Sequence, residues 1–368
     1  MICKQIKIEN FRNAESANVG FSDGVNILLG NNAQGKTNLI EAIYFVAIGK
    51  SFRSAHESDI IKFEKDIALI SLDFYDNIRN QNITMSISRQ KRRQVLQNKV
   101  KIYKMSDIVG QFRAVLFCPE HLSLIKEGPS LRRNFLDIAI SQLRPNYLHS
   151  LQKYNKILKQ RNQLIKDYLK DKKTFDNTIE FWSAQLAHEA AVISKYRLWY
   201  VEKLGEKVKR CFSEMTNDKE NVTVEYIPSI KCDDFQNIEQ SEKIYCEVLS
   251  KNHDREISAG VTLYGIHKDD IEIELNGKNS RLFASQGQQR SLALAMKLAE
   301  GEICFDEFSE YPVFLLDDVL SELDDIRRKY LINQTNNKQV IMSCCEINRD
   351  IVKNAKIISV ENGVYTEQ

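Results

Sequence analysis

The chain has 368 residues, of which 43% are hydrophobic and 28% charged, and its formal net charge is +2. That length allows two or three domains with sizeable cores. The small net charge excludes a protein that is basic overall, so any nucleic-acid surface must be a local patch. No apolar run approaches the roughly 20 residues needed to cross a bilayer, and residues 1–9 do not resemble a signal peptide.

Eight cysteines are scattered along the chain, and none belongs to a C-x-x-C pair of the kind that holds zinc. Such scatter in a chain of this length is typical of reduced thiols in the cytosol. The sequence therefore predicts a cytoplasmic protein without a membrane partner.

The first region, residues 1–125, is predicted to be mostly strand. Residues 1–9 alternate charged and apolar side chains, and residues 67–74 and 83–87 carry apolar or alternating patterns. Residues 24–30 form a short apolar strand that ends in glycine, and residues 37–46 then carry apolar side chains at helical spacing. The start of the chain thus predicts a strand–loop–helix unit.

The second region, residues 126–259, is predicted to be mostly helical. Apolar side chains recur at helical spacing over residues 147–169 and 179–212, and a polar turn at 170–177 separates the two patterns. Two long helices joined by a short turn predict an antiparallel hairpin. The third region, residues 260–368, returns to alternating strands and helices. The simplest architecture is one α/β ATPase core built from both chain ends, with the helical region inserted.

A G-x-x-x-x-G-K-[ST] motif joins the predicted strand at 24–30 to the helix that follows. It consists of Gly30, Asn31, Asn32, Ala33, Gln34, Gly35, Lys36 and Thr37. Glycines let successive backbone N–H groups point at phosphate oxygens, and the helix adds its positive N-terminal end. Lys36 is expected to reach the β- and γ-phosphates, and the Thr37 hydroxyl to bind Mg²⁺. The motif predicts ATP binding.

The apolar strand 312–318 ends in two carboxylates that fit a Walker B sequence. Asp317 would hold Mg²⁺, and Asp318 would act as the general base that polarises the attacking water. The alternative is a buried strand capped by two solvated acids. The phosphate-binding motif earlier in the chain favours the first interpretation.

A second loop, Ser285-Gln286-Gly287-Gln288, precedes a strongly apolar helix. Ser285 can cap that helix and leave free N–H groups at its start, where a γ-phosphate could bind beside Gly287 and Gln288. An ordinary capped core helix is the alternative. Just after the Walker B sequence comes Ser321-Glu322-Leu323-Asp324.

Together these segments resemble the ABC-type ATPases of the SMC-like branch, in which residues 285–288 match the signature motif and 321–324 the D-loop. The resemblance is closer to the bacterial RecF family. The stretches that carry it occur in the same order over nearly the whole chain: 10–13 (NFRN), 30–37, 49–53 (GKSFR), 117–122 (FCPEHL), 132–137 (RRNFLD), 158–162 (LKQRN), 265–270 (GIHKDD) and 285–290.

The resemblance implies an α/β ABC-type P-loop ATPase head with an inserted helical hairpin domain. It further implies a homodimer that forms around ATP, because the signature of one subunit completes the ATP site of another. The implied function is recombinational repair and replication restart, including the SOS response, with RecR as partner and recombinase loading at single-strand gaps. The implied enzyme is a weak, DNA-stimulated ATPase that acts as a switch.

Three departures from the ABC pattern matter. Asp318 stands where most ABC ATPases have glutamate, although the RecF family shares the aspartate, and a shorter base is expected to slow hydrolysis. The strand at 339–343 is followed by Cys344-Cys345-Glu346 without the switch histidine of transporters. No Q-loop glutamine is evident, and Glu120 is only a weak substitute.

Two basic clusters are candidates for sequence-independent DNA contacts. The first includes Arg89, Lys91, Arg92 and Arg93 in a predicted ribbon, and the second includes Lys159 and Arg161 on the helical hairpin. A solvated charged face is the alternative for either cluster.

Two other functions remain open. An ATPase subunit of a transporter would leave the insertion and the ribbon unexplained, and a small-molecule kinase would not need residues 285–288.

Overall fold

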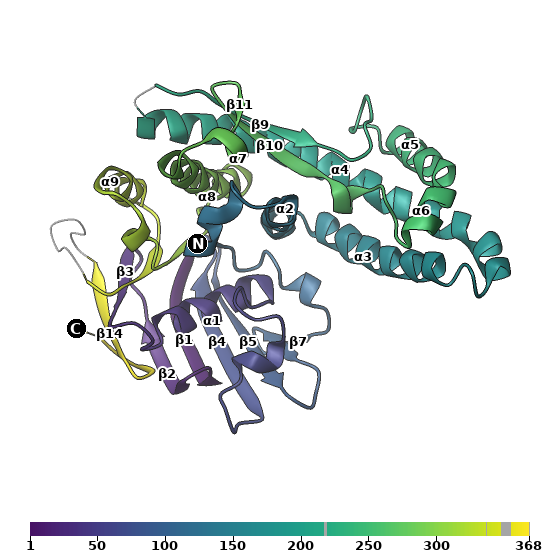
Figure 1. Cartoon of the computed structure of the whole chain (residues 1–368). Coiled ribbons are helices and arrows are strands. Elements are labelled where there is room, and N and C mark those ends of the chain that lie inside the picture. The colour runs from purple at the N-terminus through teal and green to yellow at the C-terminus, as the bar shows by residue number, and fades with distance from the viewer. Residues whose placement is uncertain (217–218, 336, 347–354, 368) are drawn as a thin grey trace. The chain divides into compact units, whose positions relative to one another are not determined.

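The structure is a computed structural model that describes residues 1–216, 219–335, 337–346 and 355–367. The chain forms two compact units (Figure 1). The core unit comprises Met1–Ser123, Arg210–Glu220 and Ser285–Gln368, and the helical unit comprises Leu124–Lys209 and Asn221–Ala284. Within the described residues, no helix combines the length and apolar character that crossing a membrane requires.

The first sheet of the core unit is antiparallel, with the strand order β2-β1-β4-β5-β6-β7. Its strands are β1 (Ile2–Phe11), β2 (Ala14–Gly20), β4 (Ile67–Tyr75), β5 (Asn80–Ser88), β6 (Gln94–Gln97) and β7 (Val100–Ile102). Every second side chain of β4 and β5 is buried. This alternation is expected of an antiparallel sheet that is covered on one face.

The second sheet of the core unit has the order β15-β14-β3-β13-β12-β8. Its parallel strands are β3 (Val25–Leu29), β8 (Ala114–Phe117), β12 (Val313–Asp317), β13 (Val340–Cys344) and β14 (Lys356–Glu361), and β15 (Val364–Glu367) is antiparallel at one edge. Every residue of β8, β12 and β13 is buried. Both faces of this sheet are therefore covered, as is usual for parallel strands.

Helix α1 (Lys36–Ile48) contacts strands of both sheets. Residues 39–47 of this helix are all buried, and all of them except Glu41 join one hydrophobic cluster with side chains from the two sheets. A helix with buried apolar side chains around its circumference has to be enclosed, so the core lies around α1. The other helices are α8 (Gln286–Phe308), α9 (Asp325–Gln334) and the 3₁₀ turns η1 (Glu57–Ile60), η2 (Met105–Asp107), η3 (Pro119–Leu124) and η5 (Leu320–Glu322).

The helical unit contains an antiparallel hairpin of two long helices, α3 (Pro145–Lys166) and α4 (Lys172–Thr216), and the last residues of α4, from Arg210 onward, belong to the core unit. Contacts between Arg197 and Tyr147 and between Arg161 and Ser183 fix the hairpin register. A three-stranded sheet has the order β11-β10-β9. The remaining elements are α2 (Pro129–Leu143), β9 (Val222–Ile227), α5 (Ile238–Lys251), α6 (His253–Ala259), η4 (Ile266–Lys268), β10 (Asp270–Leu275), β11 (Lys278–Asn279) and α7 (Ser280–Phe283).

The units differ from the predicted boundaries of 1–125, 126–259 and 260–368. Residues 260–284 belong to the helical unit, because β10 pairs with β9 rather than with a strand of the core. Residues 210–220, predicted as part of the insertion, belong to the core unit. The hairpin turn lies at 167–171 rather than 170–177, since α4 already begins at Lys172.

Candidate nucleotide-binding site

Three neighbouring parallel strands bring the predicted ATP-site segments together. In the sheet, β13 lies between β3 and β12, and Ser343 on β13 is in register with Leu28 and Asp317. The carboxyl ends of parallel strands meet at one edge of a sheet, which is where ligands bind in open α/β folds. The phosphate-binding motif follows β3, and the Walker B carboxylates end β12.

The backbone of the loop from Gly30 to Thr37 requires small residues. Gly35 has φ 114°, and Ala33 also lies in the left-handed region with φ 64°. A Cβ on Gly30 would collide with the backbone carbonyl of Val360 on β14. Gly35 caps α1 without a side-chain hydrogen bond, so the first N–H groups of the helix have no side-chain partner in the part of the chain that the structure describes. The loop thus ends in a helix start suited to an anion.

Lys36 is folded onto its own loop. Its ammonium donates to the carbonyl oxygens of Gly30 at 2.5 Å and Asn31 at 2.8 Å, and lies 3.5 Å from Sγ of Cys345. The residue is only 6% exposed. A nearly buried ammonium held by neutral carbonyls can exchange these partners for phosphate oxygens, which carry charge and bind it more strongly. The side chain therefore fits a polyphosphate.

Oxygen atoms suited to Mg²⁺ come from both the phosphate-binding motif and the Walker B strand. Thr37 Oγ1 donates to Asp317 Oδ1 at 2.9 Å, and Ser343 Oγ donates to the same oxygen at 2.8 Å. Burial raises the pKa of Asp317, while the hydrogen bonds from Ser343 and Thr37 act in the opposite direction. The described residues contain no cluster of three metal-binding acidic, histidine or cysteine side chains. One carboxylate and one hydroxyl still fit Mg²⁺, which commonly takes its other ligands from phosphate and water.

Asp318 has an unusual backbone conformation. Its φ is 51°, in the left-handed region, and its N–H donates to Ser343 Oγ at 2.9 Å. Its carbonyl oxygen accepts a hydrogen bond from Ser321 Oγ at 2.7 Å. A non-glycine residue in this region persists only when its surroundings impose it, and such residues gather at functional sites. These bonds fix the backbone of the half-buried Asp318 at the end of β12.

The signature segment starts α8 through a capping box. Ser285 accepts from the Gln288 N–H, and the Gln288 side chain accepts from the Ser285 N–H. Gln288 also donates to Glu220. Within the described chain, no hydrogen bond joins residues 285–288 to residues 30–37. Ser285 is exposed, so the start of α8 is accessible from solvent.

The D-loop is tied to the signature helix. Arg290 on α8 donates to the Glu322 carbonyl at 2.7 Å, and Arg327 on α9 donates to Ser291 Oγ at 2.6 Å. Asp324 caps α9. Because Ser321 bonds to Asp318, one chain of contacts runs from the Walker B end to the signature helix.

Comparison with known proteins places these segments in a family. The model described as the RecF/RecN/SMC N terminal domain matches residues 2–366. The DNA replication and repair protein RecF of Clostridium tetani (strain Massachusetts / E88) is 37% identical over 370 residues, covering 100% of each chain. This chain belongs to the RecF family.

Two solved structures are similar to the chain. One is described as the recombination mediator protein RecF-ATPrS in the RecFOR pathway; it is 33% identical with a TM-score of 0.93, covering 99% of this chain and 97% of that one. An SMC head domain from Pyrococcus furiosus, 17% identical with a TM-score of 0.56 over 100% of this chain and 96% of its own, shares the fold alone. The predicted fold class, an α/β ABC-type P-loop ATPase head with an inserted helical hairpin domain, is confirmed.

Residues near the RecF-family site were not singled out from the sequence as site residues. Arg12 makes a two-pronged ion pair with the fully buried Glu41, at 2.6 and 2.9 Å, and also donates to Ser54 Oγ. Asn38 on α1 donates to Asn13 Oδ1 at 2.7 Å and accepts from Arg53 at 2.9 Å. The one sequence signal for these residues is that the stretches 10–13 and 49–53 carry the family resemblance.

A cavity of about 540 Å³ adjoins these side chains. Its lining residues are Arg12, Asn13, Asn38, Arg53, Ser58, Asp59, Ile61, Phe63 and Arg89. Phe63 is 84% exposed, and Arg89 donates to the backbone carbonyls of Lys65 and Ile61. Arg89 is exposed and lies beside Asn38, which directly follows the nucleotide-binding motif of this RecF-family chain, and its contact with DNA stays a prediction.

The other predicted DNA contacts fall into two groups. Lys91, Arg92 and Lys159 are exposed. Arg93 donates to the Gly49 carbonyl and pairs with Glu57, and Arg161 is 0% exposed. The structure contradicts a DNA contact for Arg161, because DNA cannot reach it, and Arg93 is committed to internal partners.

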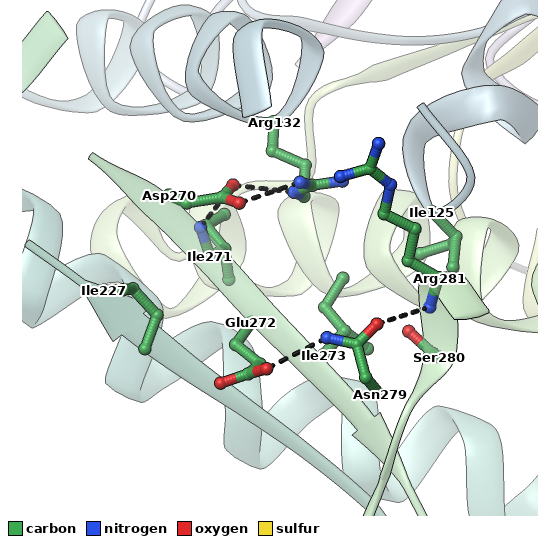
Figure 2. A pocket seen from close by; sticks show the side chains of 10 residues that line it. All are labelled: Ile125, Arg132, Ile227, Asp270, Ile271, Glu272, Ile273, Asn279, Ser280 and Arg281. Carbon is green, nitrogen blue, oxygen red and sulfur yellow. Dashed lines mark hydrogen bonds and ion pairs between the residues drawn. The ribbon is translucent and has the colours of Figure 1, made fainter. Parts of the chain in front are cut away.

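A cavity in the helical unit has a volume of about 170 Å³. Figure 2 shows the side chains that line it. Arg132 makes a two-pronged ion pair with Asp270, and Asn279 donates to Glu272. Arg281 and Glu272 add one charge of each sign, so the lining residues carry no net charge.

Proposed function

We propose that the chain is an ATP-driven, DNA-binding switch in recombinational repair and replication restart. ATP joins two copies on DNA, and slow hydrolysis separates them. The observation that carries the proposal is the arrangement at the strand ends. Lys36, Thr37 and Asp317 lie together, whereas the exposed signature segment makes no hydrogen bond to them within the described chain.

ATP binding is supported by the fit of the loop to phosphate and by the solved relative described with RecF-ATPrS. Lys36 would bind the β- and γ-phosphates, and the start of α1 would bind the remaining oxygens. The nucleoside would occupy the cavity beside Asn13 and Asn38, where Phe63 offers an exposed aromatic face. Arg12 and Arg53 share an ion pair with Glu41, and Arg89 adds a further positive charge against Asp59, so the cavity would keep a small positive charge that suits a nucleotide.

Hydrolysis would depend on the two Walker B carboxylates. Thr37 and Asp317 would hold Mg²⁺, which supplies charge neutralisation at the phosphates when bound. Asp318 would accept the proton of the attacking water. Its side chain is one methylene shorter than the glutamate of most ABC ATPases, so we propose slow turnover suited to a timer.

Dimerisation would complete the ATP site. The start of α8 would present the Ser285 hydroxyl and the N–H groups of Gln286 and Gly287 to a γ-phosphate, because the capping box already pairs the N–H groups of Ser285 and Gln288. A second copy would bring its own residues 285–288 to the phosphates held by residues 30–37. The contacts from Arg290 to Glu322 and from Ser321 to Asp318 would couple the two halves within each chain.

The output would be a protein complex on DNA. Relatives are named DNA replication and repair proteins, and one structure is described within the RecFOR pathway. We propose RecR as partner, recombinase loading at single-strand gaps as the consequence, a role in the SOS response, and a cytoplasmic location. Exposed Lys91, Arg92 and Lys159 would contribute phosphate contacts that carry no sequence information.

The coupling between ATP and DNA is testable by measuring DNA affinity against salt concentration with ATP, with ADP and for Lys36→Ala. Tight binding with a steep salt slope should require both ATP and an intact Lys36, because phosphate contacts release counterions. Lys50→Ala, which removes an exposed lysine near the end of α1, is the matched control. Equal affinity in all four cases would sink the proposal.

A further inference from the structure

The segment from residue 89 to residue 104, here called the basic ribbon, contains seven lysines and arginines and no acidic residue. The structure divides these cations. Arg89 and Arg93 bind internal partners, as described above. The other five are exposed and have no ion pair among the described residues: Lys91, Arg92, Lys99, Lys101 and Lys104. An uncompensated local charge of this size attracts a polyanion.

The turn of the basic ribbon is fixed by hydrogen bonds of Asn98 and holds a lysine at its tip. Asn98 and Lys99 join β6 to β7 with φ values of 50° and 69°. Two-residue hairpin turns with two positive φ angles normally place glycine second. Asn98 is fixed by hydrogen bonds to Gln81 and Asn82, each 2.8 Å long. Lys99 thus has a left-handed backbone conformation that side chains such as lysine rarely adopt. Such a residue at the tip of the turn indicates that its charge has a function.

An aromatic face lies beside these cations. Tyr103 is 85% exposed, and the ammonium of Lys101 lies 5.4 Å from the centre of its ring. Val100 on the same ribbon is 65% exposed. One ordinary role of lysines on an edge strand such as β7 is to prevent pairing with a strand of another molecule. That role does not account for an exposed tyrosine with a cation against its ring.

We propose that the basic ribbon binds unpaired nucleotides of DNA, with a base stacked on Tyr103 and the flanking phosphates on Lys99 and Lys101. Stacking on an aromatic side chain needs a base with a free face. Duplex DNA hides its base faces within the stack, so Tyr103 selects a single-stranded segment. The inference rests on the proposed DNA-binding function and names the substrate class that this surface takes.

The test measures binding of the full chain to a single-stranded oligonucleotide and to a duplex of the same length, by fluorescence anisotropy. Tyr103→Ala should weaken single-strand binding by about 5- to 100-fold and leave duplex binding within about twofold. Tyr103→Phe should restore single-strand binding, because it keeps the ring. Tyr75→Ala, which removes a partly exposed tyrosine from β4, is the control and should change neither.

A 2-aminopurine base in the single strand supplies a second readout. Its fluorescence should be quenched by the wild type and by Tyr103→Phe but not by Tyr103→Ala, since quenching reports stacking. Unchanged affinity and quenching in Tyr103→Ala would overturn the inference. If the double variant Lys99→Gln, Lys101→Gln still bound DNA more weakly than the wild type, the proposed DNA-binding function would stand without it. Equal losses on duplex and single strand would also overturn it. A wild type that binds no DNA at all would overturn both proposals.

Discussion

At the residue scale, Cys345 occupies the position whose role the sequence left open. It follows β13, and its thiol lies 2.9 Å from Asn32 Oδ1 and 3.5 Å from the Lys36 ammonium. Transporter ATPases are expected to have a histidine in this region. Here the sulfur contacts both Asn32 in the phosphate-binding loop and the Lys36 ammonium. We therefore regard Cys345 as a residue that positions this loop and Lys36 for the proposed ATP site.

Cys345→Ala should weaken ATP binding by about two- to tenfold, because one hydrogen bond contributes about 0.5–1.5 kcal/mol. Cys345→Ser should stay within about twofold of the wild type, since its hydroxyl can still donate to Asn32. Titration with a fluorescent ATP analogue measures both. Cys232→Ala, in the helical unit, serves as the control, and an alanine variant at 345 with unchanged affinity would remove Cys345 from the site.

His267 gives the helical unit a defined sensitivity to acid. Burial lowers the pKa of His267 to about 4, although its bond to the Thr262 carbonyl acts in the opposite direction. Its Nδ1 accepts from the Tyr154 hydroxyl at 2.7 Å, and its Nε2 donates to the Thr262 carbonyl at 3.1 Å. The neutral ring satisfies both partners, which explains why the folded chain disfavours the protonated form.

The unfolded chain protonates this histidine near its ordinary pKa of about 6.5, whereas the folded chain does so only near 4. Stability is therefore full above pH 6.5 and falls as the pH drops towards 4, by about 3 kcal/mol in total. Urea unfolding of His267→Gln should show a shallower loss over this window than the wild type. His56→Gln, which changes an exposed histidine, should keep the wild-type slope; identical slopes for all three chains would refute the assignment.

At the element scale, the helical hairpin separates two cations that look alike in the sequence. Lys159 and Arg161 lie two residues apart on α3, and both were predicted to contact DNA. Lys159 is exposed, whereas the Arg161 guanidinium is 0% exposed and pairs with Glu256 at 2.6 Å. It also contacts Ser183 and Thr262.

Arg161→Met should lower the free energy of unfolding by about 3–5 kcal/mol, because it leaves the carboxylate of Glu256 buried without its partner. Lys159→Ala should change stability by no more than about 0.5 kcal/mol. Chemical denaturation monitored by circular dichroism provides both values. Similar small effects at the two positions would show that the Arg161–Glu256 pair does not stabilise the hairpin.

The elements that the sequence predicted are those with strong local patterns. The strand before residue 30, helix α1 and the two hairpin helices were all anticipated, since apolar periodicity over consecutive residues determines them. The β9–β10–β11 sheet was not predicted. Its pairing joins residue 222 to residue 275, and no short-range pattern encodes which distant strand a short strand joins.

Individual side chains were harder to predict than the motifs. The positions of Lys36, Thr37 and Asp317 follow from spacing that is tied to a strand and a helix. The burial of Arg161 does not, because an arginine on a charged helix face has no sequence signal that distinguishes a buried partner from solvent. Likewise, no sequence pattern places Arg89 in the cavity, because its neighbours there, within residues 58–63, are distant from it along the chain.

At the scale of the whole molecule, the proposed switch depends on two copies sharing each ATP site. Residues 30–37 would come from one chain and residues 285–288 from the other. Lys36→Ala damages the first half, and Ser285→Arg blocks the second with a bulky cation. A closed dimer of identical chains has two such sites, so one mixed dimer of the two variants contains one intact site and one doubly damaged site.

Sedimentation velocity with ATP and DNA, on each variant alone and on their equal mixture, tests this claim most directly. The wild type should sediment as a dimer with ATP and as a monomer with ADP. Each variant alone should stay monomeric, and the mixture should regain dimers, because only mixing restores an intact site. A Ser285→Arg chain that dimerises normally, or hydrolyses ATP normally as a monomer, would contradict the account.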